Sequence, residues 1–323
     1  MREDMDRREF LKSSAALSTA ASLALGGANR VNAKPKKNTT AKSSSMPRGT
    51  IGDLQVSRLI SGGNLLGGWA HARDLNYVGQ LMRHYNTEKK ILDTLERMEK
   101  NGVDTIIAYI HGKTPIPGST QKQSIMEKYW EERGGSMKWI AQCTANVKDL
   151  YYDIDWAVDH GACAAYMNGG LVEKWAEQDR HHLLGKCVDR IKQHDIPAGY
   201  GAHKLDHIIA AESGGVDPDF YMKTLHPTDY WSFTSPREHN NAWATDPKRT
   251  IEYMKDIDTP WIAFKVLAAG AVHPGKGFRF AFENGADFIC VGMFDWQVEE
   301  DVKIARRTVR QVKKAGRQRR WHG

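Results

Sequence analysis

Polar side chains stand at or just after the ends of several short apolar runs in this sequence. In chain order they are His111, Gln142, Asn168, His203, Lys223, His226, Lys265 and Asp295. Histidine and lysine move protons near neutral pH when their surroundings tune their pKa values. Gathered at one mouth, these side chains predict general acid–base chemistry, with His111 and His226 as the proton carriers. For any one of them alone, a structural hydrogen bond is the alternative.

Two lysines interrupt apolar runs. Lys265 lies within residues 261–267, and Lys223 lies within residues 220–226. Desolvation lowers the pKa of a lysine amine, which suits it to proton abstraction beside a carbonyl, to imine formation, or to holding an enolate or carboxylate. We therefore expect Lys265 and Lys223 to be catalytic and to stabilise enolate-like charge. The alternative is that either lysine points outward between helices and pairs with an acid.

The histidines also permit a metal site. His111, His203 and His226, with Gln142 or an acid as a fourth ligand, are suitable ligands for Zn, Mn or Fe if they gather from different strand ends. No local ligand spacing supports such a site. A divalent metal cofactor is therefore an alternative to metal-free acid–base chemistry.

Two long segments are rich in aromatic and charged side chains. Residues 64–87 contain Trp69, His71, Arg73 and Asp74, and residues 226–245 contain Trp231, Arg237, His239 and Trp243. Long aromatic loops suit a carbohydrate, which stacks on aromatic faces and bonds to charged groups. We expect substrate contacts from Trp69, His71, Arg73, Asn168, Trp231 and Asp295. The alternative is that the loops pack as a lid.

The elements that must position these side chains alternate in type along the chain. Short apolar runs, typical of buried parallel strands, are found at 56–62, 103–110, 137–144, 162–167, 197–201, 219–225, 261–266 and 287–291. Amphipathic runs, typical of helices, are found at 88–100, 121–133, 147–159, 172–194, 203–213, 246–257, 275–284 and 297–314. Eight βα units within residues 51–315 predict a (β/α)8 TIM barrel, with its active site at the carboxyl ends of the strands. An open doubly wound sheet is the alternative.

Four patches of the sequence resemble the aldo/keto reductases, in particular a divergent bacterial branch. They are residues 52–63, beginning Gly52-Asp53-Leu54; Gly199-Tyr200-Gly201-Ala202-His203; Phe264 to Gly270; and Val291-Gly292-Met293 with Glu299 to Val302. The resemblance implies that these are strands one, five and seven and the last strand with its helix. It supports the same barrel.

The resemblance does not extend to the catalytic residues of the reductases. Those reductases use Asp, Tyr, Lys and usually His to deliver a proton while NADPH delivers hydride. Here Ile107 stands at the Asp position, His111-Gly112 lies within a residue of the Tyr-Gly position, and Gln142-Cys143-Thr144 replaces the expected Lys. An acid without these neighbours loses the groups that tune its pKa.

The N-terminus has the layout of a twin-arginine export signal. Arg7-Arg8 precedes Phe10-Leu11-Lys12, an apolar stretch from Ala15 to Leu25, and the small-residue site Val31-Asn32-Ala33. We expect residues 1–33 to be the signal peptide, residues 34–50 to be a disordered linker, and the mature protein to be periplasmic. The apolar stretch is too short for a stable membrane anchor.

The net charge of +7 resides in the tails. Residues 49–305 hold 28 Lys/Arg against 35 Asp/Glu, whereas residues 306–323 hold eight basic and no acidic residues. An acidic body argues against nucleic-acid binding. We expect residues 316–323 to form a solvated basic tail.

Together these features predict an exported barrel enzyme that performs general acid–base chemistry, metal-assisted or not, on a carbohydrate or oxidised sugar. Lyase, isomerase and hydrolase reactions all fit. One alternative is an NAD(P)H-dependent reductase of the aldo/keto type. A second is a non-catalytic protein that binds a glycan with the same aromatic loops.

Overall fold

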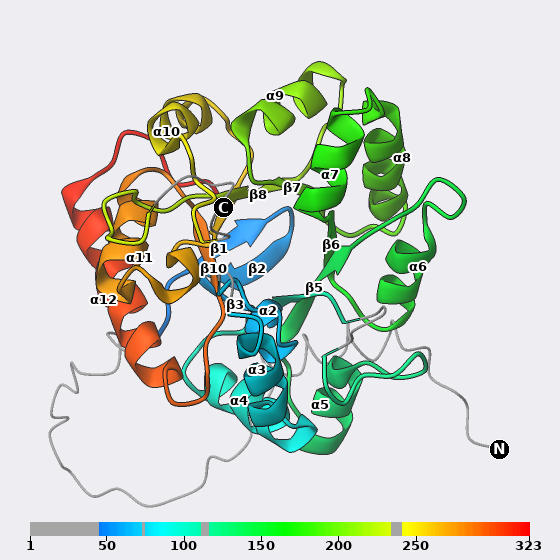
Figure 1. Cartoon of the computed structure of the whole chain (residues 1–323), viewed down its shortest axis with the longest axis vertical. Coiled ribbons are helices and arrows are strands. Elements are labelled where there is room, and N and C mark those ends of the chain that lie inside the picture. Colours follow the sequence, from blue (N-terminus) through cyan, green and yellow to red (C-terminus); the bar gives the residue numbers. More distant parts are fainter. Residues whose placement is uncertain (1–44, 73–74, 111–115, 234–240) are drawn as a thin grey trace, which may run out of the picture. The chain divides into compact units, whose positions relative to one another are not determined.

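Eight parallel strands close into a barrel in the computed structural model, with helices around it (Figure 1). The structure describes residues 45–72, 75–110, 116–233 and 241–323. Neighbouring strands pair in the order β10-β3-β4-β5-β6-β7-β8-β9. Closure of the sheet confirms the predicted (β/α)8 barrel and excludes the open doubly wound sheet.

Each barrel strand lies within or beside an apolar run that predicted it. The strands are β3 (Leu59–Gly62), β4 (Thr105–Ala108), β5 (Lys138–Cys143), β6 (Ala164–Met167), β7 (Ala198–Ala202), β8 (Phe220–Thr224), β9 (Trp261–Phe264) and β10 (Phe288–Val291). All but β7, which is shifted by one residue, are shorter than the runs, because residues at the ends of a run do not complete the ladder of hydrogen bonds.

The helices largely follow the amphipathic pattern. They are α2 (Gly63–Leu66), α3 (Val78–Tyr85), α4 (Glu88–Lys100), α5 (Ile125–Arg133), α6 (Tyr152–Asp159), α7 (Gly169–Ala176), α8 (His181–Lys192), α9 (Leu205–Ser213), α10 (Pro247–Lys255), η1 (Ala268–Gly270), α11 (Pro274–Glu283) and α12 (Val298–Ala315). The single helix expected over 172–194 is wrong. Asp179 has a left-handed φ of 53°, which ends α7 and lets α8 begin at His181.

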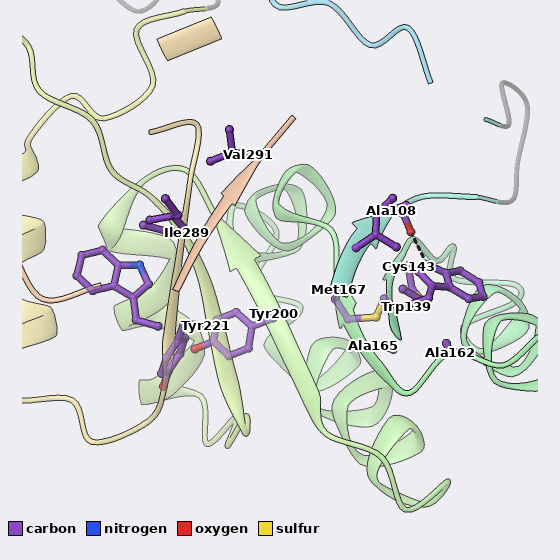
Figure 2. Packing of buried hydrophobic residues seen from close by; sticks show 14 of the residues in the cluster. Ala108, Trp139, Cys143, Ala162, Ala165, Met167, Tyr200, Tyr221, Ile289 and Val291 are labelled. Atoms are coloured by element: carbon purple, nitrogen blue, oxygen red, sulfur yellow. Dashed lines mark hydrogen bonds between the residues drawn. The ribbon is translucent and has the colours of Figure 1, made fainter. Parts of the chain in front are cut away.

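Side chains of the strands alternate between two apolar layers. Ile107, Ile140, Met222 and Ile262 belong to the inner layer, inside the barrel. Their chain neighbours pack in the outer layer beneath the helices, where Trp139 donates a hydrogen bond to the carbonyl of Ala108 (Figure 2). This alternation follows from the two-residue repeat of a strand and explains why both faces are apolar.

A two-stranded hairpin closes the amino-terminal end of the barrel. It consists of β1 (Arg48–Ile51) and β2 (Leu54–Ser57), joined by a turn at Gly52, whose φ of 55° is left-handed. Ile51 and Val56 are fully buried in the inner layer. The linker expected to run to residue 50 therefore stops before β1, because this end of the barrel needs apolar side chains to exclude water.

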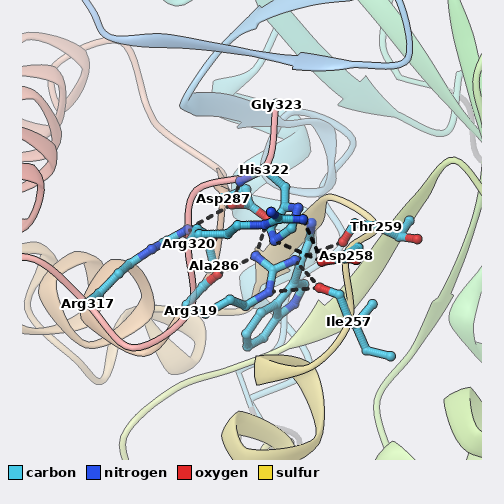
Figure 3. A network of polar contacts seen from close by, with 12 residues as sticks. Ile257, Asp258, Thr259, Ala286, Asp287, Arg317, Arg319, Arg320, His322 and Gly323 are labelled. Atoms are coloured by element: carbon cyan, nitrogen blue, oxygen red, sulfur yellow. Dashed lines mark hydrogen bonds and ion pairs between the residues drawn. The ribbon is translucent and has the colours of Figure 1, made fainter.

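The C-terminal residues also differ from the expectation of a solvated basic tail. Arg317 and Arg319 are buried and form ion pairs with the two carboxylate oxygens of Asp287 (Figure 3). The tail folds back because Asp287, immediately before β10, is itself fully buried and needs positive partners. No helix within the described residues is long and apolar enough to cross a membrane.

Candidate active site

The carboxyl ends of β7, β8 and β9 place ionisable side chains in one group. We define the mouth cluster as Glu173, His203, Lys223 and Lys265, together with the rings of His71 and Trp243. His203 follows β7 directly, Lys223 lies in β8, Lys265 follows β9, and Glu173 comes from α7. His71 and Trp243 are supplied by loops after β3 and β8. This is the end of the barrel where βα loops build active sites.

Glu173 and His203 form the central pair of the mouth cluster. Glu173 Oε1 accepts hydrogen bonds from the backbone N–H of His203 at 2.6 Å and lies 3.0 Å from Nδ1 of its ring. Burial alone raises the pKa of Glu173, but the hydrogen bonds and charge of His203 outweigh burial and lower that pKa to about 2. Glu173 is therefore an anion that fixes the ring of His203 through Nδ1 and leaves Nε2 for proton transfer.

The pKa of His203 results from opposing effects. Burial lowers this pKa, the bond to Glu173 raises it, and the charges of Lys265 and Lys223 lower it, with a net lowering. The ring also packs against Trp243, with 4.4 Å between centroids. A neutral imidazole held by a carboxylate is a suitable general base.

Lys265 approaches two rings. Its Nζ lies 2.7 Å from His71 Nε2 and 4.3 Å from the ring centroid of Trp243. Burial lowers the pKa of Lys265 to about 7, although the charge of Glu173 acts in the opposite direction. Burial, followed by the charges of Lys265 and His203, lowers the pKa of His71 to about 3. Near pH 7 this site therefore contains a neutral His71 and a lysine that is partly neutral.

Lys223 is part of the cluster but is enclosed by it. Its side chain is 1% exposed. Nζ donates to the carbonyl oxygens of His203 at 2.6 Å and Thr224 at 3.0 Å, and to Thr224 Oγ1 at 2.9 Å. Burial lowers the pKa of Lys223 to about 7. These contacts make Lys223 a positioning residue, which holds the end of β7 where His203 begins.

His226, expected to carry protons or bind metal, has a different environment. It is fully buried, and its Nδ1 lies 2.9 Å from the carbonyl oxygen of Pro227. Its Nε2 accepts from the backbone N–H groups of Trp243 at 3.0 Å and Ala244 at 2.9 Å. Both nitrogens are thus engaged by backbone, so His226 anchors the loop that presents Trp243.

The other residues expected at the site make different contacts from those of the mouth cluster. Asn168 caps α7 by accepting from the N–H of Gly170, and Asp295 binds the hydroxyl of Tyr85 and the amine of Lys90. Trp69 is 47% exposed and Trp231 is 86% exposed. His111 and Arg73 lie outside the described residues.

The expected metal site includes His111, which lies outside the described residues, so only its other members can be compared with the structure. Among the described residues, no group of three or more His, Cys, Asp and Glu side chains is arranged to hold a metal ion. Gln142, the proposed fourth ligand, instead accepts a hydrogen bond from Tyr166 at 2.7 Å.

A recess adjoins the mouth cluster. It has a volume of about 80 Å³, is open to solvent, and is lined by His203, Lys223 and the first turns of α9 and α10. Arg249 and Asp206 form an ion pair of 2.6 Å among the lining residues. The lining is partly polar, and the space is smaller than the pockets that enclose whole small-molecule ligands, so it can receive only part of a ligand.

Sequence reasoning missed Glu173 and did not select Trp243 from its loop. Glu173 looks like an ordinary solvent-facing residue of an amphipathic helix. Only its position in the sequence could have indicated a role at the site. It lies early in the helix that follows a barrel strand, where side chains reach the mouth of the barrel. Nothing in the sequence distinguishes Trp243 from the other aromatic residues of its loop. Its position depends on the hydrogen bond from its backbone N–H to His226, which only the structure shows.

Comparison with known proteins supports the fold. No family model matches the chain, and no curated protein matches its sequence. Two solved structures of a putative aldo-keto reductase from Pseudomonas aeruginosa are similar, with TM-scores of 0.57 and 0.54. Each is 13% identical and covers 81% of this chain and 94% of its own. A dihydropteroate synthase from Vibrio fischeri matches with a TM-score of 0.43, 14% identity, and coverage of 82% and 99%. This chain is therefore a (β/α)8 barrel similar in fold to aldo-keto reductases.

Proposed function

We propose that this protein is an acid–base enzyme that removes and returns a proton on the carbon beside a carbonyl group of a sugar-type substrate. The reaction class is isomerisation or β-elimination of an oxidised sugar. The observation that supports this proposal is the Glu173–His203 pair beside Lys265. Proton removal of this kind needs a base and a positive group near the carbonyl oxygen, where charge develops.

Each member of the cluster has a role in this reaction. Glu173 holds Nδ1 of His203, so Nε2 of His203 takes the proton from carbon. Lys265 lies near the developing enolate, and its mobile proton allows it to neutralise that charge. Trp243 contacts both His203 and Lys265, so its ring holds the base and the amine next to each other.

A nicotinamide-dependent reductase is the second candidate because of the similarity in fold. The site residues do not fit it. Ile107, at the position of the reductase Asp, is an apolar side chain buried in the inner layer of the barrel. We therefore assign no step to a nicotinamide cofactor.

Solvent exchange tests the proposal. Dialysed protein without nicotinamide is incubated in D2O with dihydroxyacetone, D-fructose or 5-keto-D-gluconate, and deuterium on carbon is followed by NMR. We expect exchange with at least one probe to exceed the buffer rate by about tenfold or more, and to return to that rate in Lys265→Met. His182→Ala, at an exposed histidine of α8, is the matched control. Exchange unchanged in Lys265→Met, or dependent on added NADPH, contradicts the proposal.

We also propose that the protein reaches the periplasm folded, through twin-arginine export. The support is the sequence of residues 7–33, together with a compact barrel that can fold before export. Replacing Arg7 and Arg8 by lysines preserves charge and is expected to leave the protein in the cytoplasmic fraction, measured by cell fractionation and immunoblot. Equal periplasmic amounts of both forms exclude this route.

A further inference from the structure

We propose that Lys265 acts covalently, forming an imine between its Nζ and the carbonyl carbon of an aldehyde or ketone substrate. This inference rests on the proposed function and deepens it, because it identifies how the carbonyl is activated. Three independent observations support it: the partners of Nζ, the backbone conformation at Lys265, and the contrast with Lys223.

The partners of Nζ are rings. Among the residues that the structure describes, no carboxylate lies within ion-pair distance of Lys265, whereas Lys90, Lys128 and Lys138 each have one. An imidazole and an indole face do not stabilise an ammonium ion as a carboxylate does. Burial lowers the pKa of Lys265 to about 7, which provides a neutral amine near neutral pH. A neutral amine is the form that attacks a carbonyl.

The backbone around Lys265 is strained. Lys265 has a φ of 57°, and Ala268 and Ala269 follow with φ of 46° and 56°. A left-handed conformation costs a non-glycine residue roughly 1–3 kcal/mol, and such strain gathers at functional sites. Here this conformation directly follows β9, and the amine reaches His71 and Trp243 in the loops at the mouth.

The two lysines of low pKa are not equivalent. Lys223 donates three hydrogen bonds to protein oxygens and is 1% exposed, so its nitrogen is already engaged and must give up these bonds before it can attack a carbonyl carbon. Lys265 is half-buried, and its Nζ contacts the rings of His71 and Trp243 rather than protein oxygens. The contacts of the two amines therefore favour Lys265 as the lysine that forms the imine.

The reaction balances without a further reagent. The lone pair of neutral Nζ forms a bond to the carbonyl carbon, and the C=O π electrons move to oxygen. A proton passes from nitrogen to that oxygen, with His71 Nε2 at 2.7 Å placed to relay it. A second proton, taken from solvent water, lets the hydroxyl leave as water, which yields a protonated imine. This iminium accepts the electrons released when His203 removes the adjacent proton, which gives an enamine. His203 then returns the proton to carbon, and addition of water to the re-formed iminium releases the carbonyl product, the neutral amine and the proton taken from solvent.

Borohydride trapping tests the inference. Whole protein is incubated with pyruvate or D-glyceraldehyde and sodium cyanoborohydride, and the adduct is located by intact mass and peptide mapping. We expect one adduct, on Lys265, with exposed Lys204 as the internal comparison, and a trapping rate that rises with pH through about 7. Lys265→Arg keeps the positive charge and is expected to abolish the adduct, with thermal unfolding confirming that the variant is folded.

The outcomes separate the two proposals. Adducts spread evenly over exposed lysines, or retained in Lys265→Arg, overturn the covalent role. Exchange that requires Lys265 without any trapped adduct also overturns it, but leaves the proposed proton chemistry intact. An adduct specific to Lys265 in a protein that exchanges no probe supports the covalent role and contradicts the proposed function.

Discussion

Replacing Asp287 by asparagine is expected to lower the free energy of unfolding by about 3–5 kcal/mol, a large fraction of the roughly 5–15 kcal/mol that stabilises a typical domain. The variant removes the negative charge that two buried arginines share. Removing one partner of a buried ion pair leaves an uncompensated charge in a medium that solvates it poorly.

The geometry around Asp287 explains the size of the effect. Oδ1 accepts from Arg317 at 2.8 Å and Oδ2 accepts from Arg319 at 2.5 Å, with side-chain exposures of 2%, 3% and 0% for the two arginines and Asp287. The carboxylate also accepts from the backbone N–H groups of Trp261 and His322. Asp287 thus joins the start of β9 to the C-terminal residues, which gather around its carboxylate (Figure 3).

Urea unfolding followed by circular dichroism measures this effect. Asp258→Asn is the matched control, because Asp258 pairs with Arg320 in the same region at 3.0 Å but both side chains are highly exposed, at 81% and 75%. An exposed pair contributes about 0–1 kcal/mol. Equal losses in the two variants contradict the assigned role of burial.

The barrel could be predicted from the sequence because its signals are local. Eight apolar runs of strand length, each followed by an amphipathic stretch, determine the order of elements. The fold of the C-terminal residues could not be predicted in this way. Arg317 and Arg319 stand in a run with the composition of a solvated tail, and their partner Asp287 is thirty residues earlier. Only the tertiary structure joins them.

The site was predicted in part for the same reason. Lys265 and His203 were identified because strand ends converge, which is a property of the barrel. The expected proton-carrying role of His226 failed on local geometry, because two backbone N–H groups point at its Nε2. No pattern in the sequence shows which backbone N–H groups a long loop will place beside a buried histidine.

Glu173→Gln is expected to lower the rate of the exchange reaction by about 10²–10⁴-fold with little effect on stability. Glutamine can still accept the backbone hydrogen bond of His203, but it no longer supplies the negative charge that raises the pKa of that histidine. The pKa of His203 then falls further, so the limb of the pH–rate profile that reports its deprotonation should move to lower pH. Glu177→Gln, one turn later in the same segment and exposed, is the control. Rates measured by deuterium incorporation from pH 5 to 9 distinguish the two roles, since a merely structural Glu173 would change the rate without moving the limb.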